Sequence, residues 1–539
     1  MLNKARAHLR LFLSRIRIFS RKAGQLKRIR QGWGKRRSLA RPIERCKLYE
    51  QIDSENLADV GRFSLDSRTR SDLDIDLVFG SIDHATSSPG SQYLYQALVT
   101  PGLCAEANPI PESLVELFEA DAEVREKAQI ELLALDDDTS FSLPKLILEN
   151  LPKPPLSIAW VRLCSIILPL LIVVAVFEPI IWAAVPVMFF VNLLIHYKYE
   201  EVFGYEIDVL ASLGRLVRSS ANLYELLGQD FPSDDELVVS IKKCLPLVRK
   251  CTYVQLRDPT YLLDYLNILT LRKVHAYGSL RGQISSRQKH LRVLFRAIGL
   301  IDTCISIASY RRSRRVWCKP EFVDTPCRIH AENLLHPALA HPVGNSFEIR
   351  ESSILITGSN MSGKTTFLKT VALNAILAQT INTSIASKYE ACPFYIKSSI
   401  DIADDIESGK SLFAAELDVI QELVGCSTSQ NNCLFIVDEL FRGTNPVERV
   451  AAASAVVQYL AKSNLVLVAT HDLAIGTLLG SDFDRYHFSE HYQDGDILFD
   501  YCLKPGICKT TNAIELLSRG DFPDELVAQA VDNLKRLTE

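Results

Sequence analysis

Residues 358–365 read Gly-Ser-Asn-Met-Ser-Gly-Lys-Thr, and this octapeptide constrains the fold of the 539-residue chain more than any other feature does. An apolar stretch at 354–356 precedes it and a largely apolar stretch at 367–373 follows, which predicts a buried strand, a loop and a helix. In the spacing GxxxxGK[ST], backbone N–H groups turn inward around phosphates, the lysine reaches the β- and γ-phosphate oxygens, and the last hydroxyl binds Mg²⁺. The sequence therefore predicts an α/β P-loop fold that binds a nucleoside triphosphate.

The predicted nucleotide-binding residues belong to this loop and to the first turn of the helix after it. They are Gly358, Ser359, Asn360, Met361, Ser362, Gly363, Lys364, Thr365 and Thr366. We expect Lys364 to act in catalysis as well as in binding, because its charge faces the phosphate that is transferred. We expect Thr365 to be a ligand of the magnesium ion that accompanies the nucleotide.

Two adjacent acids, Asp438 and Glu439, close a second apolar run at 433–437. In a P-loop enzyme, the first acid holds the metal together with the loop threonine, and the second orients and deprotonates the attacking water. The alternative is that the acids cap the next helix. This alternative fits poorly because the sequence Arg-Gly-Thr-Asn-Pro at 442–446 delays that helix.

A third apolar run at 465–470 ends at His471. If this run is a third parallel strand, its end lies beside the two phosphate motifs, where a side chain would sense the γ-phosphate. We therefore expect His471 to be catalytic. The alternative is a structural histidine.

Residues 158–177 and 180–197 form two runs that are almost free of charge. Each run is close to the ~20 residues that cross a bilayer. Only Glu178 and Pro179 separate them, which predicts a tight helical hairpin, either transmembrane or re-entrant, with both flanks on one side. Basic flanking residues, Lys153 and Lys198, favour the cytoplasm for those flanks and for the nucleotide-binding domain. The alternative is a buried hairpin inside a large soluble core.

The net charge of −4 hides an uneven distribution. Residues 1–50 hold 16 Lys and Arg against Glu44 and Glu50, a net charge of +14, which leaves −18 for the remainder. Apolar residues interleave with these cations, and three interpretations of the segment stay open: binding to anionic lipid, binding to nucleic acid, or a transit peptide. We favour anionic lipid because a membrane hairpin is already predicted. The 13 cysteines form no CxxC pair, which indicates reduced thiols.

Helical spacing of apolar residues recurs at 209–221 and at 291–307, and both stretches are expected to pack in a helical core. A basic run, Tyr-Arg-Arg-Ser-Arg-Arg at 310–315, follows the second stretch. We expect this run to be a solvated helix end rather than a DNA contact.

Several of these motifs together resemble the MutS family, a branch of the ABC-type ATPases. The resemblance rests on Asn-Met inside the loop at 357–366, on Asp-Glu-Leu-Phe-Arg-Gly-Thr at 438–444, on Ala-Thr-His at 469–471 and on Ser-Leu-Phe-Ala-Ala-Glu at 411–416. Leu-His-Pro at 335–337 also matches. Residues 65–73, 88–90 and 93–98 resemble the opening of the helical core and lever of that family. Near 511–514 the usual Ser-Tyr-Gly-Ile wording is replaced by Thr-Asn-Ala-Ile.

The resemblance implies an ATPase domain joined to an all-α core and lever domain, with ATP and Mg²⁺ as ligands. It further implies a homodimer in which two subunits sandwich two ATP molecules head to tail. Ser411 would open the segment that reaches the γ-phosphate bound by the partner subunit. Phe347 would stack on adenine, and Asp438 would bind the metal with Thr365.

The predicted organisation is a basic segment at 1–50, a first lever part at 60–155, a transmembrane hairpin at 156–198, a second lever part at 199–322 and the ATPase domain at 323–539. No segment before residue 60 is long enough for a mismatch-reading domain, so direct mismatch reading is not expected. We expect a membrane-anchored ATPase that binds DNA in repair or recombination. The alternative is a membrane-remodelling or scaffold ATPase that does not bind DNA.

Overall fold

The chain forms two compact units, each made of several segments. The computed structural model describes residues 23–35, 41–50, 57–104, 107–149, 157–228, 231, 235–254, 265, 268–359, 361–400, 412–430, 432–441, 444–493, 496–508 and 522–538. The first unit, called the helical unit below, comprises Met1–Asn56, Ile82–Gln96 and Ile110–Ser313. The second, called the α/β unit, comprises Leu57–Ser81, Ala97–Pro109 and Arg314–Glu539. Residues 60–81 and 97–109 of the predicted first lever part therefore group with the α/β unit.

The helical unit packs its helices around α15 (Gln288–Ser313), which is buried over most of its length. Its other main helices are α6 (Ser88–Val99), whose last three residues belong to the α/β unit, α7 (Glu112–Ala120), α8 (Ala122–Leu132), α9 (Leu143–Leu148), α10 (Ile158–Ala175), α11 (Ala184–Leu227), α12 (Asp235–Val254) and α14 (Arg272–Ser285). The predicted core spacing at 291–307 is confirmed, because Leu291, Leu294 and Ile298 are fully buried.

The end of α15 differs from the expectation of a solvated basic run. Arg311 is only 1% exposed, and its guanidinium donates to the two carboxylate oxygens of Glu112 at 2.5 and 3.0 Å. Tyr310 is fully buried beside it. The prediction for 310–315 is wrong at these two positions, because a charged pair inside the fold satisfies the arginine.

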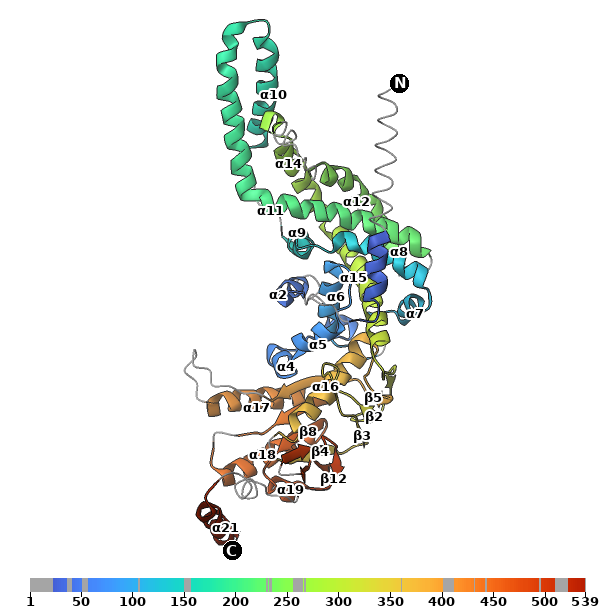
Figure 1. The fold of residues 1–539 in the computed structure, drawn as a ribbon, viewed down its shortest axis with the longest axis vertical. Coiled ribbons are helices and arrows are strands. Elements are labelled where there is room, and N and C mark those ends of the chain that lie inside the picture. The colour runs from blue at the N-terminus through green and yellow to red at the C-terminus, as the bar shows by residue number, and fades with distance from the viewer. Residues whose placement is uncertain are drawn as a thin grey trace. The chain divides into compact units, whose positions relative to one another are not determined.

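The two apolar runs form a helical hairpin, in which α10 and α11 lie side by side and the short helix η6 (Pro179–Ala183) follows the turn (Figure 1). The second helix does not end near residue 197 as predicted. It continues for 44 residues, and its later part contributes Leu210, Leu213 and Val217 to the core. One helix therefore belongs both to the hairpin and to the helical core. Within the described residues, Pro179–Phe203 is the one stretch long and apolar enough to cross a membrane, and Ala159–Ala175 is apolar but shorter.

The α/β unit is built on a six-stranded sheet with the order β12-β9-β4-β8-β7-β6. All neighbours are parallel except β12, which pairs antiparallel with β9. The strands are β4 (Ser353–Thr357), β6 (Tyr395–Ser399), β7 (Cys433–Asp438), β8 (Leu465–Thr470), β9 (Phe483–His487) and β12 (Lys504–Pro505). The helices that pack on this sheet include α16 (Lys364–Ile381), α17 (Leu412–Ser429) and α18 (Pro446–Ala461). The remaining elements of the unit include α4 (Ser67–Asp72), α5 (Ile75–Ile82), α19 (Ile475–Leu478), α21 (Asp524–Thr538) and the strands β1 (Glu321–Phe322), β2 (Ile329–Leu334), β3 (Asn345–Ile349), β5 (Lys388–Ala391), β10 (Glu490–Gln493) and β11 (Asp496–Phe499).

Strand register places the three predicted motifs side by side at the carboxyl ends of β4, β8 and β7, called one edge of the sheet here and below. Thr357 at the end of β4 pairs with Thr470 at the end of β8, and Asp438 at the end of β7 pairs with Ala469. All residues of these three strands are buried, which explains why they appear in the sequence as continuous apolar runs. The three motifs that follow the strands therefore start side by side.

Helix α4 covers the edge strand β6 within the α/β unit. Asp66 caps α4 through the backbone N–H of Thr69 at 2.9 Å and accepts from Nζ of Lys397 at 2.8 Å. Asp72, at the other end of α4, accepts from Oγ of Ser398 at 2.7 Å and from the N–H of Ile400 at 3.0 Å. These polar contacts explain why the stretch 65–73 groups with the α/β unit.

Candidate nucleotide-binding site

The phosphate loop connects β4 to α16 and depends on two glycines. Gly358 has φ +150° and Gly363 has φ +105°, values that favour glycine. A Cβ atom on Gly358 would lie 2.8 Å from the carbonyl oxygen of Phe488, so the neighbouring chain leaves no room for a side chain. Met361 also has a positive φ, and its side chain is 83% exposed. The backbone of the loop is thus wound as a phosphate cradle requires.

Lys364 begins α16 with its ammonium group folded back on the loop. Its Nζ donates to the carbonyl oxygens of Gly358 at 2.9 Å and Ser359 at 2.8 Å. Burial lowers the pKa of Lys364, and the charges of Asp438 and Glu439 act in the opposite direction. These two loop carbonyls hold the cation at the position where phosphate oxygens are expected.

The predicted metal ligands are in direct contact. Oγ1 of Thr365 donates to Oδ2 of Asp438, and this aspartate is 6% exposed. A hydroxyl and a carboxylate are the oxygen ligands that Mg²⁺ uses beside nucleotide phosphates. These two residues therefore fit the ion that the resemblance implies.

Glu439 and His471 form the second predicted pair. Nδ1 of His471 lies 2.6 Å from Oε1 of Glu439, a distance at which the ring N–H donates to the carboxylate. Glu439 has φ +55°, an unusual value for a residue with a side chain, and its N–H donates to the carbonyl of Ala469 at 3.0 Å. A backbone held in this conformation next to a phosphate loop indicates a functional position.

A cavity of about 270 Å³ adjoins the loop, and both apolar and polar side chains line it. It is lined by Leu334, His336, Leu339, Val343, Asn345, Gly363, Thr366, Phe367, Thr370, Phe488 and Tyr501. Phe347 is not among these residues. It is 6% exposed and packs edge-on against Phe367, with 5.4 Å between the ring centroids. Stacking of Phe347 on adenine stays a prediction, and the cavity instead presents Tyr501, whose ring would lie 3.0 Å from a Cβ atom on Gly363.

Glu490 is a site residue that sequence reasoning missed, and His336 was marked only as part of the Leu-His-Pro match, without a role. Oγ of Ser359 donates to Oε2 of Glu490, and Glu490 is 9% exposed. Nδ1 of His336 accepts from the N–H of Ala338 at 3.2 Å, and burial lowers the pKa of His336 to about 4. The Leu-His-Pro match marked His336, but no motif marked Glu490. Glu490 follows β9, and only the pairing of β9 with β4 brings it to the phosphate loop.

Two predicted site residues, Asn360 and Ser411, lie outside the described residues. The same holds for Arg442, Gly443 and the stretch 511–514. The remaining predicted residues of the loop, the two acids and His471 are brought together at one edge of the sheet, as expected. All cysteines are free thiols, and among the described residues no three His, Cys, Asp or Glu side chains are placed to hold a metal ion by themselves.

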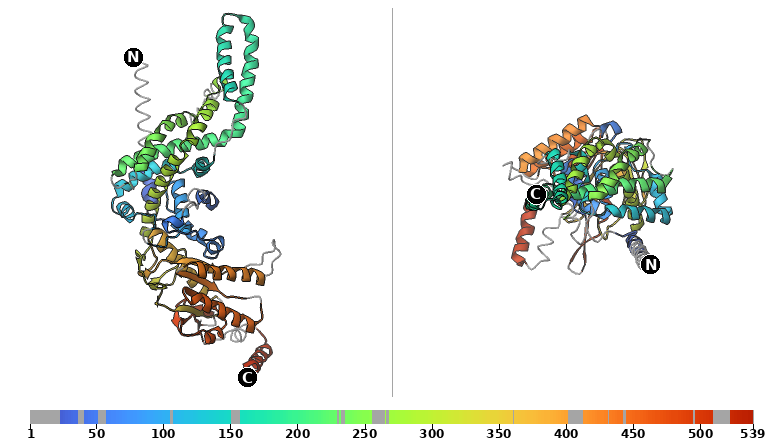
Figure 2. Two further views of the ribbon diagram at one scale, coloured as in Figure 1. Left: turned by 180° about the vertical axis from the view of Figure 1, so that it is seen from behind. Right: turned by 90° about the horizontal axis from the view of Figure 1, so that it is seen from above.

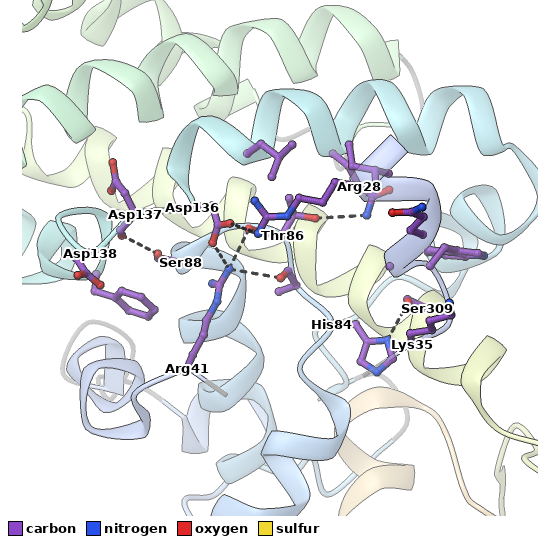
Figure 3. Close-up of a pocket in the computed structure, with 18 of the residues that line it drawn as sticks. Arg28, Lys35, Arg41, His84, Thr86, Ser88, Asp136, Asp137, Asp138 and Ser309 are labelled. Atoms are coloured by element: carbon purple, nitrogen blue, oxygen red, sulfur yellow. Dashed lines mark hydrogen bonds and ion pairs between the residues drawn. The ribbon is translucent and has the colours of Figure 1, made fainter. Parts of the chain in front are cut away.

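The helical unit contains a second cavity, of about 640 Å³, whose polar wall is held together by contacts among its own residues (Figure 3). The guanidinium of Arg41 donates to the carbonyl of Thr86 and to Oδ1 of Asp136, both at 2.9 Å. Nδ1 of His84 lies 2.8 Å from Oγ of Ser309. These contacts hold Arg41 and the loop before α6 against the rest of the helical unit. They indicate a structural network rather than a ligand site.

Comparisons with known proteins agree with this geometry. The family model "MutS domain V" matches residues 354–538. The DNA mismatch repair protein MutS of Thermus aquaticus is 26% identical over 338 residues, which cover 62% of this chain and 39% of the relative. The corresponding protein of Exiguobacterium sp. is 26% identical over 353 residues, and the DNA mismatch repair protein MutS 2 of Haloarcula marismortui is 33% identical over 194 residues, 20% of its length. The alignments thus span about two fifths of the first two relatives, or less.

Proposed function

Because this chain belongs to the MutS family through its α/β unit, we propose that it binds ATP with Mg²⁺ and hydrolyses it to ADP and phosphate. One observation carries the proposal: the Thr365–Asp438 contact and the Glu439–His471 contact lie at the same sheet edge as the phosphate loop. P-loop hydrolysis needs these components together.

The described side chains have distinct roles in this reaction. Lys364 exchanges its two loop carbonyls for phosphate oxygens, which keeps its charge satisfied when the nucleotide enters. Thr365 and Asp438 would hold Mg²⁺, which neutralises phosphate charge when it is bound. Glu439 accepts a proton from the attacking water, and His471 orients the carboxylate through its ring N–H.

Replacing Glu439 with Gln tests this assignment. The variant keeps the shape of the site but cannot accept the proton, so ATP should bind normally while turnover falls by about 100-fold or more. Lys364→Ala should instead weaken ATP binding itself. Steady-state hydrolysis and a nucleotide-binding titration measure the two effects separately. Near-normal turnover of Glu439→Gln would remove Glu439 from its role as the base.

We further infer that the hairpin anchors the protein in a membrane, with the α/β unit in the cytoplasm. Only 17% of the 18-residue apolar window within Pro179–Phe203 is buried, whereas a core helix would be mostly buried. Exposed apolar side chains run along both helices: Trp160, Leu163, Ile166, Leu170, Val173, Val176, Phe177, Ile180, Trp182, Val187, Phe190, Leu194 and Tyr197. The 16 residues of α10 from Trp160 to Ala175 rise ~24 Å, which approaches the ~30 Å of a bilayer core.

DNA binding, dimerisation and a role other than mismatch reading remain part of the proposal. The names of the relatives support DNA repair, and the exposed hairpin favours the alternative of a membrane-remodelling ATPase. Measuring ATP hydrolysis with duplex, branched and mismatched DNA over a salt series separates the two. Stimulation that fades with salt supports DNA binding, because phosphate contacts depend on salt. Unchanged hydrolysis supports the alternative.

The described part of the basic N-terminal segment is folded onto the helical unit. Arg30 donates to both carboxylate oxygens of Glu126 at 2.8 and 2.9 Å, and Arg45 pairs with Asp138 at 2.8 Å. The guanidinium of Arg125 stacks on the ring of Trp33 at 3.7 Å. These contacts supply a structural role for residues 23–35 and 41–50. The proposed lipid contact of the basic segment therefore concerns mainly residues 1–22 and 36–40, which lie outside the described part of the chain.

A further inference from the structure

A second strongly basic segment lies in the helical unit, after the hairpin. Residues 235–301 contain 12 Lys and Arg against four Asp and Glu, a net charge of +8 in a chain whose net charge is −4. The segment comprises α12, α14 and the first half of α15. Since charge of one sign in a folded unit repels itself, such an excess indicates a partner of opposite charge.

The outward side of α12 concentrates this charge. Its inward side is fully or nearly fully buried at Leu237, Ile241, Cys244, Leu247 and Cys251, which recur at helical spacing. Between them, four exposed cations lie on the outward side, and this set is called the cationic face below: Lys242, Lys243, Arg249 and Lys250. In the part of the chain that the structure describes, no carboxylate forms a salt bridge with these four.

Helix α14 joins the cationic face to the base of the hairpin. Nζ of Lys250 donates to Oγ of Ser279 on α14 at 3.3 Å. At the start of α14, Nε2 of His275 lies 2.9 Å from Oγ of Ser165 on α10, and the ring of Tyr277 lies 4.4 Å from that of Phe203 on α11. Figures 1 and 2 show α14 running from the hairpin base towards α12. The contacts are therefore continuous from α12 through α14 to the helices of the hairpin.

From this continuity we propose that the cationic face binds anionic lipid headgroups of the bilayer into which the hairpin inserts. The proposal rests on the membrane insertion proposed above and adds a lipid class to it. A basic helix at the base of a membrane segment meets the negative headgroup layer at short range, within the ~8–10 Å over which charges act at physiological salt.

Apolar residues on the same side of α12 favour lipid over nucleic acid. Leu245 is 45% exposed and lies between Lys243 and Arg249 in the sequence. Val239, one helical turn before Lys243, is 42% exposed. A helix at a membrane surface buries such side chains among the acyl chains while its cations remain at the headgroups. A nucleic-acid backbone would leave them in water.

The test uses the full-length protein and two kinds of vesicle, phosphatidylcholine alone and phosphatidylcholine mixed with phosphatidylserine. Wild-type protein should partition more strongly onto the anionic vesicles, and added salt should reduce the difference. A variant with Lys242→Gln, Lys243→Gln, Arg249→Gln and Lys250→Gln should lose about tenfold or more of this preference, since each cation near the surface contributes about fivefold.

A matched control removes four exposed cations from the α/β unit: Arg350→Gln, Lys388→Gln, Lys462→Gln and Arg536→Gln. It changes net charge equally and should retain the preference. An unchanged preference in the cationic-face variant, or equal binding of wild type to both vesicles, overturns the proposal. Loss of duplex DNA binding without loss of lipid preference overturns it in favour of nucleic acid.

Resistance to carbonate extraction, measured on the same vesicles, reports insertion separately from headgroup binding. Wild type and both variants should resist extraction from either vesicle. If the wild type is extracted, membrane insertion itself fails. If all three resist extraction without any lipid preference, only the headgroup inference fails.

Discussion

At the scale of single residues, close approaches in the helical unit show how strictly some positions are determined. Asp302 is fully buried and accepts from the N–H groups of Thr86 and Ser87 at 2.9 and 2.6 Å. Burial raises the pKa of Asp302. A Cβ atom on Gly90 would lie 2.2 Å from Oδ2 of this aspartate. The carboxylate thus occupies the space that a side chain at position 90 would need, and its hydrogen bonds hold the loop before α6.

Gly90→Ala should destabilise the helical unit by about 2–4 kcal/mol, because either the added methyl or the buried carboxylate must move. Thermal unfolding of the detergent-solubilised protein measures the loss. Gly282→Ala is the matched control, since nothing lies within 4 Å of a Cβ atom there. That change in α14 should be neutral or stabilising by up to ~1 kcal/mol. Equal effects of the two variants would contradict the close contact.

His336 makes the stability of the α/β unit depend on pH. Burial lowers its pKa from 6.5 to about 4, so the folded state favours the neutral ring. As pH falls from about 6.5 to about 4, the unfolded state takes up the proton first, and the unit should lose up to about 3 kcal/mol. Hydrogen–deuterium exchange of α16 over this range measures the loss. His336→Gln should flatten the dependence, and a steep profile in that variant would assign the titration to another group.

At the scale of elements, the sequence predicted the strands and helices that the spacing of buried apolar residues determines by itself. The strands β4, β7 and β8 and the helices α10 and α15 follow continuous or helical apolar patterns. The contacts among the site residues follow from the start of α16, which holds Thr365, and from the ends of β7 and β8, where Asp438, Glu439 and His471 lie. The pattern could not show that α4 would join β6, because that contact depends on polar groups distant in sequence. The burial of Arg311 was equally hidden, since its partner Glu112 lies 199 residues away.

Asp72→Ala should destabilise the α/β unit by about 2–4 kcal/mol, because the hydroxyl of Ser398 and the N–H of Ile400 would be buried without an acceptor. Chemical denaturation of the purified protein measures this loss. Arg68→Ala in the same helix removes only a surface ion pair with Glu422 and should cost no more than ~1 kcal/mol. Comparable losses would show that α4 is held by general packing and not by the buried carboxylate.

At the scale of the whole molecule, the MutS resemblance implies a dimer with shared sites. Mixing a Ser411→Arg chain with a Lys364→Ala chain gives heterodimers in which one site carries both changes and the other carries neither. The intact site should restore hydrolysis that neither variant shows alone. Measured activity that merely equals the sum of the two separate variants, with heterodimers verified by crosslinking, would favour a site complete within one chain.

Helix α11 also fixes the rotational relation between two apolar stripes, one exposed and one buried. Its first half carries the exposed apolar stripe of the hairpin, and its second half carries the buried stripe of the helical core, without a break over 44 residues. Each residue rotates the side-chain direction by ~100° about the helix axis, so a one-residue insertion in the middle would point one stripe away from its surroundings. Two full turns, about seven residues, would restore the match. The number of residues between the stripes is therefore constrained as tightly as their identity.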